Sequence, residues 1–245
     1  MRLQGKIAIV TGAGSGFGAG IARKFAAEGA QVIVADLNAE AARAVAEEIG
    51  GIACQVDVAS GDSVGAMASA AARIGAIDVL VNNAGITHLP TPLEAVSEAE
   101  FDRVFAVNCK SVFLTARAFV PGMKQRGRGA ILNVASTAGL SPRPRLNWYN
   151  ASKGWMITAT KTMAVELAPA GVRVNAICPV AGETPLLKSF LGEDTPEMRA
   201  KFLSTIPIGR FSTPEDMGNA ACYLCSDEAS MVTGVALEVD GGRCI

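Results

Sequence analysis

Short apolar runs alternate with alanine-rich stretches along this chain. Seven runs carry mostly Val, Ile and Ala: KIAIV (6–10), QVIVA (31–35), IACQV (52–56), DVLVN (78–82), AILNV (130–134), RVNAI (173–177) and ALEVD (236–240). We predict that each run is a β-strand. Stretches such as FGAGIARKFAAEG and AEAARAVAEEIG have the helical period, and Gly50 ends the second. Near-continuous apolar strands separated by helices predict an α/β fold with a parallel sheet covered on both faces.

We expect the chain to fold as one domain, residues 1–245. A chain of 245 residues can bury a large core, and no linker rich in Pro, Gly or Ser divides it. The longest stretch without a clear pattern is 178–211. We expect its residues from about 183 to 211 to form a mobile lid over a binding site.

Charge and hydropathy argue against some classes of partner. Lys and Arg total 22 against 23 Asp and Glu, so a net charge of -1 offers no electrostatic footprint for nucleic acid or an anionic membrane. No long apolar segment precedes the first glycines, and no run of 18 apolar residues follows. We therefore expect a cytoplasmic protein with small-molecule or protein partners and with neither nucleic acid nor membrane.

The cysteines and the single histidine suggest no metal site. The six cysteines, at 54, 109, 178, 222, 225 and 244, have no framework spacing, which fits reduced thiols. Cys222 and Cys225 form a C-x-x-C within a helical stretch, without a second pair or a nearby His. We interpret them as buried small residues and not as a redox or zinc motif. His88 alone cannot build a multi-histidine site.

Four glycines follow the first predicted strand in VTGAGSGFGAGIA, at 12, 14, 16 and 18. Glycine permits a tight turn and lets backbone N–H groups approach a pyrophosphate, while the helix that starts here adds partial positive charge. Asp36 ends the next strand about 20 residues later, where a carboxylate can accept bonds from an adenosine ribose. The alternative is that Asp36 caps the helix beginning near Asn38. The stretch AGSG at 13–16 is not a G-x-S-x-G elbow, which argues against a hydrolase.

A tyrosine and a lysine share one helical face in WYNASKGW, residues 148–155. Tyr149 and Lys153 are four positions apart, a spacing that brings side chains together on any helix and often only covers apolar surface. The pair alone therefore leaves its purpose open, and the motifs elsewhere in the chain decide it.

These motifs together resemble the short-chain dehydrogenase/reductase family. They are TGAGSGFG, Asp57 in QVDV, NNAG at 82–85, Asn108, Ser136 in NVAS, and Tyr149 with Lys153. The resemblance covers nearly the whole chain, through VTGVALEVDGG at 232–242, and its order and spacing are highly specific. It implies a doubly wound, Rossmann-type fold with a seven-stranded parallel sheet and helices on both faces. It also implies a bound nicotinamide cofactor and hydride transfer to or from an alcohol carbon.

Family roles transfer position by position. The implied cofactor-binding residues are Gly12, Ser15, Gly16, Phe17, Gly18, Asp36, Leu37, Asp57, Val58, Asn83, Ala84, Gly85, Tyr149, Lys153, Pro179 and Thr184, and the implied catalytic residues are Asn108, Ser136, Tyr149 and Lys153. Ser136 would hold the substrate oxygen against Tyr149, and Lys153 would reach the nicotinamide ribose. Asn108 would relay a proton through water to Lys153, unless it is an ordinary buried amide with its hydrogen bonds satisfied.

One segment departs from the family's pattern. After the sixth strand, relatives usually carry Pro-Gly, then an aliphatic residue, then a Thr that contacts the carboxamide. Here Val180 follows Pro179, and Gly182 replaces the aliphatic residue before Thr184. The carboxamide contact is therefore the cofactor contact that the sequence supports least.

The pKa of Tyr149 has to shift if this residue is to serve as general acid and base. A free phenol has a pKa of about 10, and lowering it to about 7 takes roughly 4 kcal/mol. A Lys153 ammonium one helical turn away and a positively charged nicotinamide ring are partners that stabilise a phenolate. We expect them to lower the pKa of Tyr149.

The expected function is that of an NAD(H)-dependent oxidoreductase acting on a secondary alcohol or its ketone. Asp36 would repel the 2′-phosphate of NADP(H), and neither Leu37 nor Ser15 supplies the cation that NADP-preferring relatives often carry. The same motifs permit an NADPH-dependent 3-oxoacyl thioester reductase. A non-catalytic dinucleotide-binding scaffold is a third interpretation, which the presence of both Tyr149 and Lys153 opposes. Relatives of this kind assemble through helices and the last strand, so we expect a homotetramer.

The segment STAGLSPRPRLNWYNASK, residues 136–153, suggests a substrate class. In the implied fold it runs along the rim of the substrate cleft, and its two prolines would fix where Arg143, Arg145 and Trp148 point. Arginine suits the bidentate binding of a carboxylate, and His88 can approach the same cleft from another loop. The hypothesis is a small polar or anionic hydroxy compound. The alternative is that both arginines are solvated or lie in subunit contacts.

Overall fold

The computed structural model describes residues 1–245, apart from the side chain of Leu191. Its strands are β1 (Ile7–Thr11), β2 (Gln31–Asp36), β3 (Ile52–Gln55), β4 (Val79–Asn82), β5 (Gly129–Val134), β6 (Val172–Pro179) and β7 (Ala236–Val239). Its helices are α1 (Gly16–Ala27), α2 (Ala39–Ile49), α3 (Gly61–Ile74), α4 (Glu98–Phe105), α5 (Ser111–Arg126), α6 (Asn147–Leu167), α7 (Leu187–Leu191), α8 (Pro196–Leu203) and α9 (Pro214–Cys225). The seven strands predicted from the sequence are thereby confirmed to within about two residues at each end, the usual uncertainty of element boundaries.

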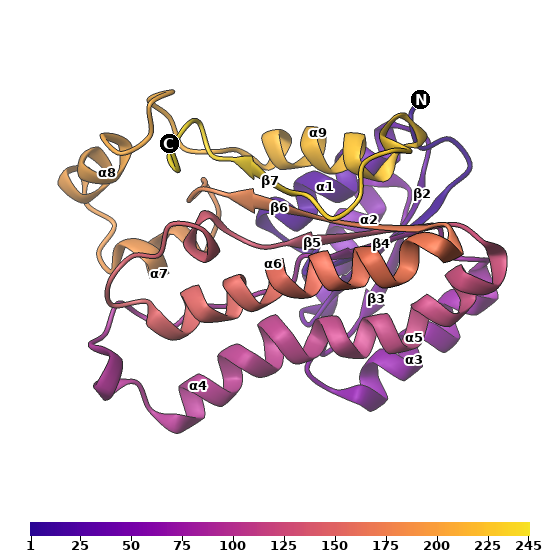
Figure 1. Cartoon of the computed structure of the whole chain (residues 1–245), viewed down its shortest axis with the longest axis horizontal. Helices are drawn as coiled ribbons and strands as arrows, with labels where there is room; N and C mark the ends of the chain where they lie inside the picture. Colours follow the sequence, from indigo (N-terminus) through magenta and orange to yellow (C-terminus); the bar gives the residue numbers. More distant parts are fainter.

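All seven strands form one parallel sheet in the order β3-β2-β1-β4-β5-β6-β7. The order reverses between β1 and β4, which makes the sheet doubly wound and creates a crevice at the carboxyl ends of the strands. Helices α1, α2 and α9 lie on one face, and α3, α5 and α6 lie on the other (Figure 1). The fold class predicted from the sequence is therefore confirmed.

Each central strand serves two cores, which explains its near-continuous apolar sequence. In β1, Ala8 and Val10 point into the core beneath α1 and α9, whereas Ile9 points into the core beneath α3 and α5. Successive side chains of a strand point to opposite faces, so a sheet covered twice needs apolar residues at every position. Cys222 and Cys225 in α9 belong to the first core, which confirms their interpretation as buried small residues.

Local capping signals set the ends of the helices. The Asn38 side chain accepts hydrogen bonds from the backbone N–H groups of Glu40 and Ala41 and so caps α2, and Gly50 ends that helix in the left-handed conformation. The alternative that Asp36 caps this helix is therefore wrong. Asp36 lies outside the helix and is available to the site.

The segment that we expected to be irregular contains two short helices. After β6, α7 and α8 lie beyond the carboxyl ends of the strands (Figure 1). Leu187 and Phe202 pack there with Val180, Ile206 and Phe211 in a small cluster of their own. The residues from 183 to 211 are thus a separately packed cover at this end of the sheet, and their mobility stays a prediction.

A continuous 29-residue helix runs from Glu98 to Arg126 and joins α4 to α5 through a π-helical turn at Ala106–Lys110. By length and composition alone this helix could span a membrane. Its buried residues Val112, Phe119 and Met123 belong to the cores beside the sheet. We therefore interpret it as a core helix of the α/β layer.

A chain of hydrogen-bonded, buried polar side chains runs along one face of the sheet from α5 to α6. The Thr115 hydroxyl donates to Asn82 Oδ1 at 2.8 Å, Asn82 Nδ2 donates to Asn133 Oδ1 at 2.8 Å, and Asn133 Nδ2 donates to Thr160 Oγ1 at 2.9 Å. Thr160 in turn donates to the Met156 carbonyl at 2.8 Å. All four polar side chains are at least 96% buried, so each needs its partner. The chain fixes α6 relative to β4 and β5, next to the functional residues that α6 carries.

Candidate active site

One cavity of about 440 Å³ opens at the carboxyl ends of the central strands. It extends from Asp36 and Leu37 at the end of β2, past the glycine loop, to Tyr149 and Lys153 on α6. Of the predicted cofactor and catalytic residues, all but Gly18 and Asn108 line it. This is where the reversal of strand order places a ligand in doubly wound sheets.

The glycine loop folds closely against the segment after β4. A Cβ on Gly18 would lie 2.2 Å from the Gly12 carbonyl oxygen and 2.4 Å from Asn83 Nδ2, so only glycine fits there. Asn83 Nδ2 donates to the carbonyl groups of Thr11 and Gly12 at 2.9 and 3.0 Å and so fixes the turn. Ser15, at the N-cap of α1, makes no side-chain capping bond. The first N–H groups of α1 thus lack a side-chain acceptor, which fits the binding of a pyrophosphate.

Asp36 is tied to the glycine loop. Its Oδ2 accepts a hydrogen bond from the Gly14 N–H and its Oδ1 accepts one from the Asn38 N–H, both at 2.9 Å. Leu37 beside it is 67% exposed and carries no charge. Asp57 and Val58 line the cavity at the same end. These residues form the end of the cavity that would hold the adenosine part of a dinucleotide.

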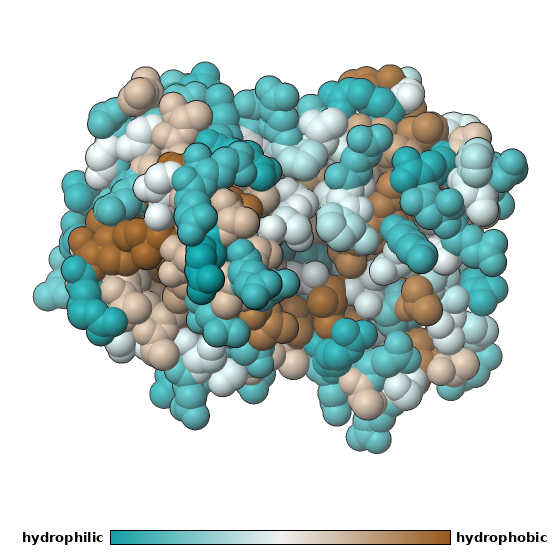
Figure 2. All heavy atoms as spheres, turned by 180° about the vertical axis from the view of Figure 1, so that it is seen from behind, coloured by the Kyte–Doolittle hydropathy of each residue, from teal (hydrophilic) through white to brown (hydrophobic). Residues whose placement is uncertain are grey.

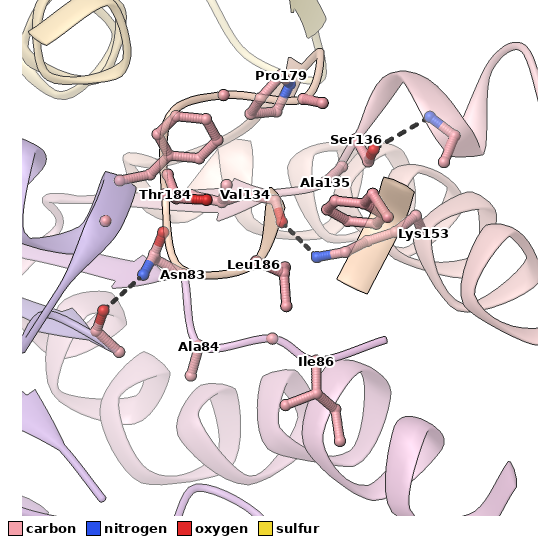
Figure 3. Close-up of a pocket in the computed structure, with 18 of the residues that line it drawn as sticks. Asn83, Ala84, Ile86, Val134, Ala135, Ser136, Lys153, Pro179, Thr184 and Leu186 are labelled. Carbon is pink, nitrogen blue, oxygen red and sulfur yellow. Dashed lines mark hydrogen bonds between the residues drawn. The ribbon is translucent and has the colours of Figure 1, made fainter. Parts of the chain in front are cut away.

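The catalytic candidates converge at the other end. Ser136 follows β5, and Tyr149 and Lys153 stand one turn apart on α6, each at least 91% buried. Lys153 Nζ donates to the Val134 carbonyl oxygen at 2.8 Å, which directs the ammonium into the cavity (Figure 3). The Lys153 Nζ atom lies 5.9 Å from the centroid of the Tyr149 ring. The Tyr149 and Phe190 rings pack edge to face. A nicotinamide ring bound here would accept or donate the hydride.

The groups of the chain itself do not lower the pKa of Tyr149, so the expected lowering stays a prediction for the protein with a bound nicotinamide. Burial raises this pKa to about 12, and the nearby Ser136 hydroxyl and Arg143 charge offset only part of that effect. Lys153 is not among the groups that lower it, and its ammonium donates to the Val134 carbonyl. Burial also lowers the pKa of Lys153, to about 8, so it remains largely protonated at neutral pH. Bringing Tyr149 from about 12 to about 7 takes roughly 7 kcal/mol, which the chain alone does not supply.

Asn108 is a buried amide whose hydrogen bonds are satisfied within the chain. It lies in the π-helical turn, where its Oδ1 accepts from the Ile86 N–H and its Nδ2 donates to the Ile86 carbonyl and to Ser152 Oγ, all at 2.9 Å. It makes no direct bond to Lys153. A Cβ on Gly85 would lie 3.3 Å from Lys153 Nζ and 3.4 Å from Asn108 Oδ1, so the two polar groups flank Gly85. A relay through water between them stays a prediction.

The departure at Gly182 has a physical reason. A Cβ at this position would lie 2.4 Å from the Phe17 ring and 2.7 Å from the Ser212 carbonyl oxygen. The large Phe17 side chain thus fills the space where relatives carry an aliphatic residue. Thr184 packs directly beside the glycine loop, since a Cβ on Gly16 would approach its Cβ to 3.2 Å.

The candidate substrate residues separate into two groups. Arg143 lines the cavity, whereas His88, Arg145 and Trp148 do not. Arg145 donates to the Pro90 carbonyl at 3.3 Å, and Trp148 donates to that of Leu93 at 3.3 Å. His88 is 2% exposed and bonds the Leu89 carbonyl through Nδ1 at 2.8 Å. These three side chains are thus hydrogen-bonded to backbone carbonyl groups outside the cavity.

Sequence reasoning did not single out four residues that line the substrate end. They are Leu186, Phe190, Phe202 and Arg243. The first three belong to the cover formed by α7 and α8, which we treated as one unpatterned stretch. The signal for Arg243 was its position directly after the last strand and its two glycines.

The fold and this cavity define a class of protein, an oxidoreductase that uses a nicotinamide cofactor and acts on CH–OH groups. A family model described as enoyl-(acyl carrier protein) reductase matches residues 12–243. The chain belongs to the short-chain dehydrogenase/reductase family, as the motifs indicated.

Three proteins illustrate how similar the relatives are. The chain is 49% identical to 4-formylbenzenesulfonate dehydrogenase of Comamonas testosteroni, over 100% of both chains. It is 40% identical to a 3-oxoacyl-[acyl-carrier-protein] reductase of Thermotoga maritima, again over 100% of both. A crystal structure of a 3-ketoacyl-(acyl-carrier-protein) reductase of Brucella melitensis complexed with NADH superposes with a TM-score of 0.95 at 50% identity, over 99% of this chain and 100% of that one.

Proposed function

We propose that this enzyme is an NAD(H)-dependent dehydrogenase that interconverts a secondary alcohol and its ketone, with Tyr149 as general acid and base. The observation that carries this proposal is that one cavity holds Ser136, Tyr149 and Lys153 at one end and the glycine loop and Asp36 at the other. An alcohol can lose the proton of its hydroxyl oxygen and the hydride of the attached carbon together only where the general base and the hydride acceptor meet.

The preference for NAD(H) over NADP(H) rests on Asp36. Both of its oxygens accept backbone hydrogen bonds, which hold the carboxylate beside the glycine loop, and Leu37 next to it brings no positive charge. A 2′-phosphate placed against this carboxylate costs several kcal/mol, enough for a preference of about a hundredfold or more. The Brucella melitensis relative is described in complex with NADH, which agrees with this proposal.

A second candidate function is reduction of a 3-oxoacyl thioester. Two relatives of at least 40% identity are described as 3-oxoacyl or 3-ketoacyl carrier-protein reductases. The test is the initial rate with NAD⁺, NADP⁺, NADH and NADPH against secondary alcohols, aryl alcohols, polyols, their carbonyl forms and acetoacetyl thioesters. Comparable kcat/KM with both cofactors would refute the NAD(H) preference. Acetoacetyl thioesters turned over far faster than every other carbonyl compound would favour the second candidate.

We further propose a homotetramer in the cytoplasm. Phe113 on α5, with Trp155 and Val165 on α6, are 55%, 40% and 79% exposed on two neighbouring helices, and Leu237 on the edge strand β7 is 38% exposed. Apolar residues gathered on adjacent elements mark an association surface. The face seen in Figure 2 carries only small separate hydrophobic patches. A monomer by light scattering at micromolar concentration would refute the tetramer.

The proposed cytoplasmic location rests on the six free cysteines, which suit a reducing compartment.

A further inference from the structure

Two arginine side chains from distant segments of the chain line the cavity. Arg143 comes from the loop before α6, and Arg243 comes from the C-terminal segment after β7. Both line the cavity that also contains Tyr149. Burial, and then the charge of Arg243, lowers the pKa of the Arg143 guanidinium. Like charges side by side in a partly buried space are unfavourable unless an anion joins them.

No carboxylate of the chain neutralises this pair. The ion pairs found among the described residues involve seven other basic side chains, and none includes Arg143 or Arg243. The Arg143 guanidinium stacks over the Phe202 ring, 4.5 Å from its centroid. Stacking uses the face of a guanidinium and leaves the N–H groups at its edge free to bind an oxyanion.

Both arginines are held in place through their backbones. Asn150 Nδ2 donates to the Arg143 carbonyl at 2.7 Å and ties the loop to α6. The Asp240 carboxylate accepts from the N–H groups of residues 242 and 244 at 2.9 and 2.8 Å and so orders the turn that carries Arg243. The backbone that carries each arginine is therefore ordered by hydrogen bonds to a side chain of the fold.

We propose that Arg143 and Arg243 bind a carboxylate or sulfonate group of the substrate while its reacting carbon lies at Tyr149. The wall between these points contains Phe190 and Phe202 and favours a flat, apolar body. A cofactor pyrophosphate would lie at the glycine loop, at the opposite end, and does not account for the pair. This inference deepens the proposed function and rests on it only for the reacting end of the substrate.

The first experiment compares two matched ketones, 4-acetylbenzoate and its neutral methyl ester, in NADH-dependent reduction. The wild type should prefer the carboxylate at least tenfold in kcat/KM. Arg143→Met and Arg243→Met keep an unbranched side chain and should each raise KM for 4-acetylbenzoate about tenfold. The values of kcat, and the rates for the ester, should change less, as for lost uniform binding. Arg145→Met, two residues away and outside the cavity, should change neither substrate's kinetics. Equal kcat/KM for the carboxylate and the ester in the wild type would overturn the proposal. Arginine variants that lower kcat/KM equally for both compounds would overturn it as well.

The second experiment measures binding without turnover. Calorimetry should detect benzoate and benzenesulfonate binding to the wild type with NADH, no binding of benzamide, and loss of anion binding in the Arg143→Met, Arg243→Met double variant. Anion binding without turnover of any carbonyl would support the arginine site and sink the proposed function. Turnover of the ester without binding of either anion would support the proposed function and overturn the arginine site.

Discussion

Tyr149 should resist ionisation in the protein without cofactor, and this can be measured directly. The chain has only two tyrosines, 149 and 223, so a Tyr223→Phe variant leaves one phenol to titrate. Burial raises the pKa of Tyr149 to about 12 from the ordinary 10.0. At pH 10.5 an ordinary tyrosine is about three-quarters ionised, whereas Tyr149 should be ionised to about 3%.

The assay is the near-ultraviolet absorbance of tyrosinate at pH 10.5, with circular dichroism to confirm that the variant is folded. Ionisation of half or more of Tyr149 in the folded protein would refute the reasoning. The sign for stability follows because the folded pKa lies above the unfolded one. The contribution of Tyr149 to the free energy of unfolding should be constant up to about pH 10 and fall by roughly 3 kcal/mol between pH 10 and 12. In the background of Tyr223→Phe, the further change Tyr149→Phe should remove this part of the pH dependence.

Three further predictions concern single positions. Tyr149→Phe should abolish turnover, because the hydroxyl that donates and accepts the proton is lost. NADH should still bind with unchanged affinity, as measured by fluorescence. A kcat above a tenth of the wild-type value would contradict the acid/base role. Asp36→Asn should raise kcat/KM for NADP⁺ about tenfold, because the repelling charge goes while the amide oxygen can still accept the Gly14 bond; an unchanged ratio of NAD⁺ to NADP⁺ would refute the charge argument. Gly182→Val should destabilise the protein by about 1–3 kcal/mol in urea unfolding, and Phe17→Leu in the same chain should restore only part of this, because the Ser212 carbonyl still blocks the new side chain. Full additivity in that cycle would show that residues 17 and 182 do not compete for space.

Local signals in the sequence predicted the fold and three residues, Ser136, Tyr149 and Lys153, that the structure brings to one cavity. The apolar strands follow from the need to fill two cores, and the four-residue spacing of Tyr149 and Lys153 fixes their common face whatever surrounds them. The glycine loop and Asp36 were predictable for the same reason, since a turn and the end of a strand are local features.

Features that depend on contacts between distant segments were not predictable. Arg143 and Arg145 differ by two positions, yet Arg145 adopts a φ of 71° and bonds Pro90, so only Arg143 enters the cavity. Arg243 reaches the same place from the end of the chain. The direction of the Tyr149 pKa shift depends on full burial, which spacing along a helix cannot reveal.

The polar chain from Thr115 through Asn82 and Asn133 to Thr160 has a consequence for how the protein opens. Each group donates to the next, in one direction, from α5 across β4 and β5 to α6. Pulling either helix away leaves a buried amide or hydroxyl without its partner, which costs about 1–3 kcal/mol at the broken link. The two helices should therefore open as one cooperative unit in native-state hydrogen exchange, with amide protons of α5 and α6 sharing a single opening free energy. The helix that carries Tyr149 and Lys153 would then unfold only together with α5.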